Sequence, residues 1–257
     1  MQTRNHAVPI LSASLLTVVL GLGAVQVQAL EFFGNKSVQG SGHAVSVKRE
    51  LSPFHQISIA LPGTVELIQG SNENIVIDAD DNLIPLIETV VKSGELSVRA
   101  VKGVNLAHAG KIRITLNARS IDALSLAGSA DLTGARLQSP RFKGDIAGAG
   151  SITIQNLQCD NVSVSIAGSG RFEVHGAAKA MDVSIAGSGD VLTSGMSVQD
   201  VNINIAGSGN ATVWVRSVLN ISIAGTGDVR YYGEGTLKEK SIMGSGRVKQ
   251  LGTTPPI

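Results

Sequence analysis

Three ionisable side chains at alternate positions are the strongest sign of acid–base chemistry in this sequence. Arg171, Glu173 and His175 would share one side of an extended strand, and Asp145 occurs about one repeat earlier. Acids and bases grouped in this way cleave glycosidic bonds. However, no other copy of the repeat described below carries such a cluster, and alternating charge is typical of a solvated strand. We interpret these residues as surface charge and predict no catalytic site.

The phrase SIAGSG, at positions 165–170 and 184–189, suggests two further chemistries. A phosphate-binding loop needs a third glycine or a Gly-Lys-Ser/Thr signature and opens a helix, whereas Gly170 leads directly into a second strand. A calcium β-roll needs a nine-residue period with an aspartate at every turn. The residues that follow the turns here are Asp131, Ser151, Arg171, Asp190, Asn210, Asp228 and Arg247. Arginine interrupts any cation ladder, so we predict no nucleotide, metal or cofactor.

The other nucleophiles and metal ligands are isolated in the sequence. The histidines at positions 43, 55, 108 and 175 lack the spacing of a metal motif, and no Gly-x-Ser-x-Gly elbow occurs. Cys159 is the only cysteine in 257 residues, so the sequence predicts no disulfide and no zinc site. We expect its thiol to be inert.

The glycine-rich phrase repeats at a steady interval of 18 to 20 residues, and this period predicts the fold. Around each glycine, apolar and polar residues alternate, as in a strand with one buried face. An antiparallel meander would not require identical copies, whereas stacked parallel coils would. The sequence therefore predicts an all-β parallel β-helix (β-solenoid) of about 19–20-residue coils. The predicted turn residues are Gly128, Gly148, Gly168, Gly170, Gly187, Gly189, Gly207, Gly209, Gly225, Gly227, Gly244 and Gly246.

The organisation of the chain follows from the extent of this repeat. Residues 1–29 resemble a cleavable signal peptide, and residues 30–257 are predicted to form a single β-solenoid domain. Within it, residues 30–120 are less regular, residues 121–252 hold seven repeats and residues 253–257 form a loose tail. The segment DNLIPLIETVVKSG predicts one short helix, capped by Asp80 or Asp81 and ended by Gly94. We expect this helix to cover one end of the stack.

Charge and hydropathy limit the classes of partner. The chain has 21 basic and 20 acidic side chains, a net charge of +1, which gives no basis for nucleic-acid binding. After position 29 no apolar stretch is long enough for a membrane-spanning helix. Aromatic residues are scarce, and Trp214, Tyr231 and Tyr232 are the predicted contact patch, although the YYGEG segment that holds the two tyrosines could equally close the end of the stack.

The stretch from ISIALPGTVELIQG to ADDNLIPLIET, followed by the SIAGSGD-like repeats, resembles the GIN-domain family of auto-transporter adhesin heads. The resemblance extends from about residue 40 to about residue 252. It implies a bacterial, exported protein with a fold similar to the pectin-lyase-like β-helices and a role in adhesion. The family has no catalytic motif, so the resemblance implies no active-site residues.

Together these observations predict a non-catalytic, exported binding or adhesion module in the periplasm or at the cell surface. Its partner would be a glycan or a surface protein, contacted through the outward Ser and Asn residues or the aromatic patch. Two alternatives stay open at this point. One is a polysaccharide lyase or hydrolase on the same fold, and the other is a structural protein that self-assembles into homo-oligomers through its open ends.

Overall fold

The computed structural model describes residues 36–106 and 111–256, all of them in one compact unit. The predicted signal peptide (residues 1–29) and His108 lie outside the described residues. No helix in the described part of the chain has the length and hydropathy needed to span a membrane.

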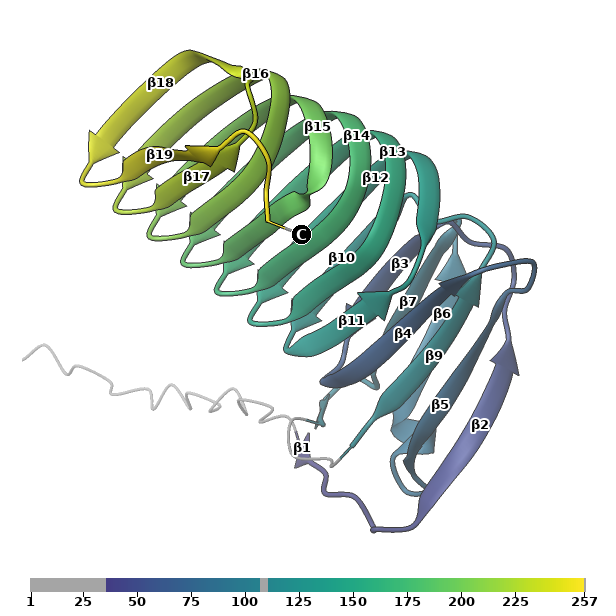
Figure 1. The fold of residues 1–257 in the computed structure, drawn as a ribbon. Helices are drawn as coiled ribbons and strands as arrows, with labels where there is room; N and C mark the ends of the chain where they lie inside the picture. Colours follow the sequence, from purple (N-terminus) through teal and green to yellow (C-terminus); the bar gives the residue numbers. More distant parts are fainter. Residues whose placement is uncertain (1–35, 107–110, 257) are drawn as a thin grey trace, which may run out of the picture. The chain divides into compact units, whose positions relative to one another are not determined.

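Nearly all described elements are strands (Figure 1). In the N-terminal part they are β1 (Lys36–Ser37), β2 (Ala44–Glu50), β3 (Gln56–Ala60), β4 (Gly63–Gln69), β5 (Asn74–Asp80), β6 (Ile87–Lys92), β7 (Glu95–Ala100), β8 (Val104–Asn105) and β9 (Arg113–Ala118). The later strands are β10 (Ala123–Gly128), β11 (Ala130–Gly134), β12 (Leu137–Gly148), β13 (Ser151–Gly168), β14 (Arg171–Gly187), β15 (Asp190–Gly207), β16 (Asn210–Gly225), β17 (Asp228–Tyr232), β18 (Thr236–Gly244) and β19 (Arg247–Gly252).

From β10 onward the chain is a parallel β-solenoid, as predicted (Figure 1). Each coil pairs in register with the next, so that Ile166 lies beside Ile185 and Ile185 beside Ile205. The seven predicted corners stack on one another, and they bound about six full turns. Apolar residues of the inward columns are almost completely buried and form one continuous core. Each buried Ile or Leu contributes about 1.5–3 kcal/mol from burial alone.

The corner glycines are required by both conformation and space. Gly187 has a φ of +122°, which disfavours any residue with a Cβ. A Cβ at this position would also lie 2.5 Å from the carbonyl oxygen of Gly168 in the preceding coil. The amide of the next residue, Ser188, donates a 2.8 Å hydrogen bond to that same oxygen. Corners can therefore stack only where the side chain is absent.

The segments that connect one corner to the next remain paired. In the sequence they are the variable part of the repeat, but β13, β14 and β15 run unbroken for 17 or 18 residues each. The differences in coil length are absorbed by register shifts, for example between Ile154 and Leu157 or between Glu173 and Gly176. Bulges of this kind bend a strand while the ladder continues on either side.

The N-terminal part is built from the same two sheet faces but in a different order. On one face β3 pairs with β10 and also with β7, and on the other β4 pairs with β11 and also with β9. The coil made by β7 and β9 is thus later in sequence than β3 and β4 but lies farther from the repeats. Antiparallel strands β6, β5 and β2 complete this end.

The predicted helix is wrong. Only Ile84–Leu86 form a single 3-10 turn, η1, and the following residues form strand β6. Strand β6 pairs antiparallel with β7 through a two-residue turn in which both Ser93 and Gly94 have positive φ. Such a turn is the favoured connection of a hairpin, because its twist matches that of the strands. Gly94 closes a hairpin rather than ending a helix, and antiparallel strands close this end of the stack.

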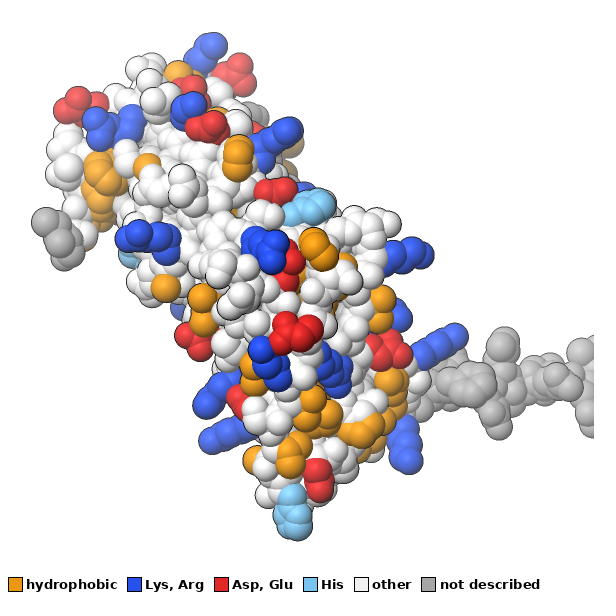
Figure 2. All heavy atoms as spheres, turned by 90° about the vertical axis from the view of Figure 1, so that its right-hand side faces the viewer, with side chains coloured by type: hydrophobic (Ala, Val, Ile, Leu, Met, Phe, Trp, Pro, Cys, Tyr) orange, Lys and Arg blue, Asp and Glu red, His pale blue; other side chains and the backbone are white. Residues whose placement is uncertain are grey.

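Figure 2 shows one face, on which basic and acidic side chains are interspersed and hydrophobic side chains form only small groups. Several ion pairs join two exposed side chains, for example Lys48 with Glu50 and Arg99 with Glu88. Exposed pairs of this kind add little to stability.

Candidate functional site

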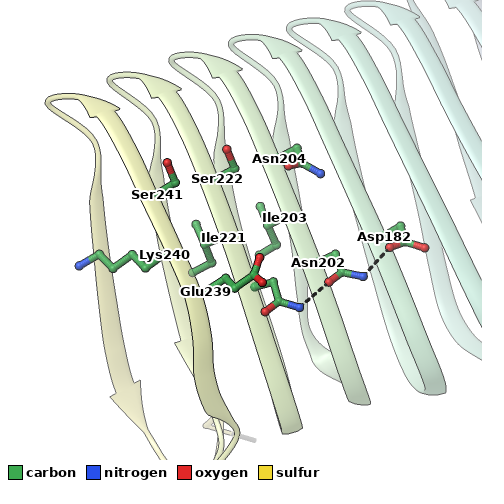
Figure 3. Close-up of a pocket in the computed structure, with 10 residues that line it drawn as sticks. Asp182, Asn202, Ile203, Asn204, Ile221, Ser222, Glu239, Lys240 and Ser241 are labelled. Carbon is green, nitrogen blue, oxygen red and sulfur yellow. Dashed lines mark hydrogen bonds between the residues drawn. The ribbon is translucent and has the colours of Figure 1, made fainter.

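A polar groove of about 690 Å³ crosses the outer face of strands β14, β15, β16 and β18 (Figure 3). The solenoid fold makes it, because residues two positions apart on each strand point outward and repeat in every coil. Two outward columns thus lie side by side. One contains Asp182, Asn202, Asn220 and Glu239, and the other contains Asn204, Ser222 and Ser241.

The first column carries a directional amide ladder. The Asn202 Nδ2 donates to Asp182 Oδ1 at 2.8 Å, and the Asn220 Nδ2 donates to Asn202 Oδ1 at 2.8 Å (Figure 3). The next coil has Glu239 in register with Asn220, and an ionised carboxylate has no N–H to donate. Asn220 Oδ1 is therefore buried without a hydrogen-bond partner in the described part of the chain. A buried acceptor left in this state costs about 1–3 kcal/mol.

Both ends of the ladder are carboxylates without a counter-ion. In the described residues no basic side chain lies within 4.0 Å of Asp182 or of Glu239. Lys240 belongs to the inward column of the last coil, and Figure 3 shows its side chain pointing away from the Glu239 carboxylate. The groove is therefore rich in hydrogen-bond acceptors, with hydroxyls that can donate or accept.

This arrangement suits reversible binding of a ligand with many donors. The described residues contain no group of three or more His, Cys, Asp or Glu side chains that could hold a metal ion. Within the groove no hydroxyl has a histidine beside it to act as a general base, because its lining residues are amides, hydroxyls, isoleucines, two carboxylates and one lysine.

The charged cluster expected on sequence grounds is spread over separate exposed pairs. His175 Nε2 lies 3.7 Å from Glu173 Oε1, and Arg171 reaches across to Asp190 on the next coil at 3.7 Å. Asp145 is paired with Lys143 on its own strand, at 2.7 Å. All these residues are at least partly exposed, as the sequence interpretation of surface charge expects.

The three aromatic residues of the predicted patch point to different sides of their strands. Trp214 and Tyr232 are in register on adjacent coils and both are partly exposed. Tyr231 is in register with the buried Val213 and packs against the core. Trp214 and Tyr232 therefore share one outward column, and Tyr231 closes the interior.

Cys159 has the environment of an unreactive thiol. It is partly buried, and its Sγ donates to the Asn161 carbonyl oxygen at 2.8 Å. Burial raises the pKa of the Cys159 thiol and so disfavours the nucleophilic thiolate.

Sequence reasoning did not single out the amide ladder. The outward Ser and Asn column next to each inward Ile was recognised, but the column two residues earlier holds the ladder. The available signal was the recurrence of Asp182, Asn202 and Asn220 two positions before Ser184, Asn204 and Ser222. Only the register of the coils shows that these side chains touch.

The chain belongs to the family described as "Putative auto-transporter adhesin, head GIN domain", which matches residues 53–235. The family resemblance seen in the sequence is therefore confirmed. No curated protein matches the chain.

Solved structures share the fold. A protein from Bacteroides fragilis named a putative adhesin is 23% identical, with a TM-score of 0.76 over 83% of this chain and 100% of that chain. A protein from Parabacteroides distasonis named a putative lipid binding protein is 24% identical, with a TM-score of 0.69 over 84% and 100% of the two chains. A putative adhesin from Parabacteroides merdae is 24% identical, with a TM-score of 0.67 over 84% and 99%.

Proposed function

We propose that this chain is a non-catalytic binding module of the bacterial envelope or surface, and that it holds its partner in the polar groove. The observation that carries the proposal is the acceptor-rich lining, in which the Asp182 and Glu239 carboxylates have no counter-ion within 4.0 Å among the described residues. Family membership supports a role in adhesion. Export follows from the signal peptide predicted at residues 1–29.

The partner that fits this lining is a polar ligand rich in N–H and O–H groups. Exposed hydrophobic side chains are scattered singly among the described residues, and the most exposed is Met243 at 69%. A flat array of amides and hydroxyls gives many weak hydrogen bonds, and affinity then depends on several coils acting together. A glycan of several units is the ligand class best matched to such an array.

The test is a panel of purified acidic and neutral polysaccharides, with retention of the protein and release of reducing ends both measured. We expect reversible retention without cleavage. Replacing Asp182 with Asn and Glu239 with Gln should weaken retention at least about tenfold, because hydrogen bonds to charged groups contribute about 1.5–3 kcal/mol each. The matched control is Asp200→Asn, which removes an exposed carboxylate from β15 outside the groove.

Bond cleavage that disappears on replacing Glu173 with Gln or His175 with Asn would contradict the binding-module proposal and support a glycan-active enzyme. If the variant with Asp182→Asn and Glu239→Gln is retained on the polysaccharides as well as Asp200→Asn is, the groove does not bind the ligand.

Self-assembly through the last coil is disfavoured by its residues. In the described part of the chain β18 pairs only with β16 and β19 only with β17, so the outer edge of each strand is unpaired. Four basic side chains, Lys238, Lys240, Arg247 and Lys249, occur on these two edge strands. Charged side chains, lysines in particular, are a common protection of an edge against further pairing. We expect a monomer by light scattering, and a concentration-dependent rise in mass would contradict this.

A further inference from the structure

A second surface, separate in its residues from the groove, is formed where three segments of the chain meet. It is a notch of about 290 Å³ beside the outward side of β16. The first half of β16, the turn between β17 and β18 and the residues after β19 each contribute to it. The lining residues are Trp214, Arg216, Gly233, Glu234, Thr253 and Thr254.

The backbone fixes the shape of this notch. Gly233 has a φ of +106°, and a Cβ there would collide with the carbonyl oxygen of Val215, so the turn lies directly against β16. The Gly233 amide donates to the Gly252 carbonyl oxygen at 2.9 Å, and the Gln250 Nε2 donates to the Gly233 carbonyl oxygen at 2.8 Å. These two bonds tie the end of β19 to the turn, and Thr253 and Thr254, the next two residues, line the notch together with Trp214.

Three kinds of group thus face one small space. Trp214 is partly exposed and supplies an apolar ring. The Arg216 guanidinium carbon lies 5.8 Å from the centre of that ring, which orients the donor group. Among the described residues Arg216 has no carboxylate within 4.0 Å, and Glu234 has no basic side chain within 4.0 Å. A donor and an acceptor are both left for a ligand.

We propose that this notch binds one neutral sugar ring. The axial C–H groups of a pyranose form an apolar patch that packs on an indole, as other apolar groups do on aromatic rings. Its hydroxyls both donate and accept, so they can bond to Glu234 and to Arg216 at once. A uronic acid would be attracted by Arg216 and repelled by Glu234, and an amino sugar the reverse, so neither charge gains a net attraction. Each charged sugar would also lose hydration on entering the notch, a cost that a neutral ring does not carry. We therefore expect a neutral ring to bind more tightly than either charged one.

The notch deepens the proposed function, because it rests on a glycan partner, but it uses residues that the groove does not. An oligosaccharide bound at the groove would not have to reach it. The two sites can consequently be tested separately, and each can fail alone.

Trp214 is the only tryptophan of the chain, so its fluorescence reports on the notch. The protein would be titrated with glucose, galactose and mannose, each against an equal concentration of glucuronic acid and of glucosamine. We expect a saturable change in emission for at least one neutral sugar, with a Kd in the millimolar range that is common for a single small ring. The charged sugars should bind at least about tenfold more weakly.

Variants locate the response. Glu234→Gln and Arg216→Ala keep the fluorophore and should each raise the Kd about tenfold or more, since each removes hydrogen bonds to a charged group. The groove variant with Asp182→Asn and Glu239→Gln should leave this Kd unchanged. Circular dichroism of each variant verifies the fold.

Two results would overturn the inference. One is the absence of any saturable response to the three neutral sugars, and the other is an unchanged Kd in both Glu234→Gln and Arg216→Ala. If the protein is retained on polysaccharides but Trp214 fluorescence does not respond to the sugars, the proposed function is supported and only the sugar site at the notch is contradicted. A lysine-rich peptide that quenches Trp214 more strongly than any sugar would also count against a sugar site.

Discussion

The repeats from Gly128 to Gly244 and the N-terminal part from Ala44 to Ala118 share two sheet faces and one core, but they stack in different ways. In the repeats each coil lies on its sequence neighbour, whereas in the N-terminal part β3 and β4 are placed between later strands. The repeats need identical corners, because each corner rests on the one before it. The N-terminal part has only one copy of each turn, so its turns are not constrained to be alike.

The largest expected difference in stability is between a substitution in a stacked corner and the same substitution in an unstacked turn. Gly187→Ala in the repeats places a Cβ 2.5 Å from a carbonyl oxygen at a φ of +122°. Gly103→Ala in the N-terminal part has a φ of +81° and no atom within 4 Å of the new Cβ. We expect a loss of more than about 3 kcal/mol in the free energy of unfolding for the first and about 1 kcal/mol for the second, measured in urea. Equal losses would contradict the stacking argument.

A smaller effect is expected where the regular column is interrupted. Gly144 replaces the Val or Ile found at this position in most later coils, and a Cβ there would lie 2.6 Å from the Phe172 ring. Phe172 is fully buried, with its ring centre 6.5 Å from that of Phe142. Gly144→Ala should therefore cost about 1–3 kcal/mol by overpacking. The control in the N-terminal part is Gly70→Ala, which has no atom within 4 Å and should change stability by less than about 0.5 kcal/mol.

A gain in stability is expected at the end of the amide ladder where Asn220 Oδ1 has no donor. Glu239→Asn would supply the N–H that Asn220 Oδ1 lacks, and we expect about 1 kcal/mol of stabilisation. The N-terminal part offers the opposite case, because Asn117 Nδ2 already donates to the buried Asn74 Oδ1 at 3.0 Å. Asn117→Ala should destabilise by a similar amount. Thermal unfolding midpoints of the two variants test both predictions. A lower midpoint for Glu239→Asn would contradict the inference that Asn220 Oδ1 lacks a donor.

The smallest effect concerns acid stability at two carboxylates. The hydrogen bond from Arg247 lowers the pKa of Asp228 below its usual value, and the hydrogen bond from Ser41 lowers that of Asp81. A lowered folded-state pKa gives stability above the unfolded value, near pH 4, that is lost as the pH falls through the folded value.

Asp228→Asn and Asp81→Asn should each flatten the fall of the melting temperature below about pH 4. Salt should weaken the contribution of Asp228 more than that of Asp81, because Asp228 is paired with the cations Arg247 and Arg230, whereas the main partner of Asp81 is the neutral hydroxyl of Ser41. Identical salt dependence in both variants would mean that Asp228 does not act through its ion pairs.

The fold of the repeats could be predicted because the same pattern of apolar residues and corner glycines recurs seven times. The residues that depart from this pattern could not be explained from the sequence. Gly144 and Lys240 interrupt an otherwise apolar column, and nothing local explains either. Gly144 makes room for Phe172, which belongs to the next coil, and Lys240 is exposed because it belongs to the last coil. The predicted helix failed because the apolar residues around η1 and in β6, at positions 83, 84, 86, 87, 90 and 91, also fit a helical period. The Ser93–Gly94 turn was the contrary signal.

The candidate surfaces were predictable only in part. Trp214 and Tyr232 could be predicted as contact residues because aromatic residues are scarce in this sequence. The inward orientation of Tyr231 depends on the alternation of side chains along β17. The notch depends on Gly233 and Gly252, whose hydrogen bond joins segments from different coils. No sequence pattern indicates that contact.

The insertion of β3 and β4 among later strands has a kinetic consequence. The bond between Gln69 and Gln138 spans 69 positions, whereas the Asn202–Asp182 bond spans 20. Closing the longer loop carries a larger entropy penalty, so the repeats can wind by short steps while the N-terminal strands must wait for β10 and β11. A chain that emerges from its N-terminus would expose these strands first. We expect them to be the segment that a chaperone or protease meets before folding is complete.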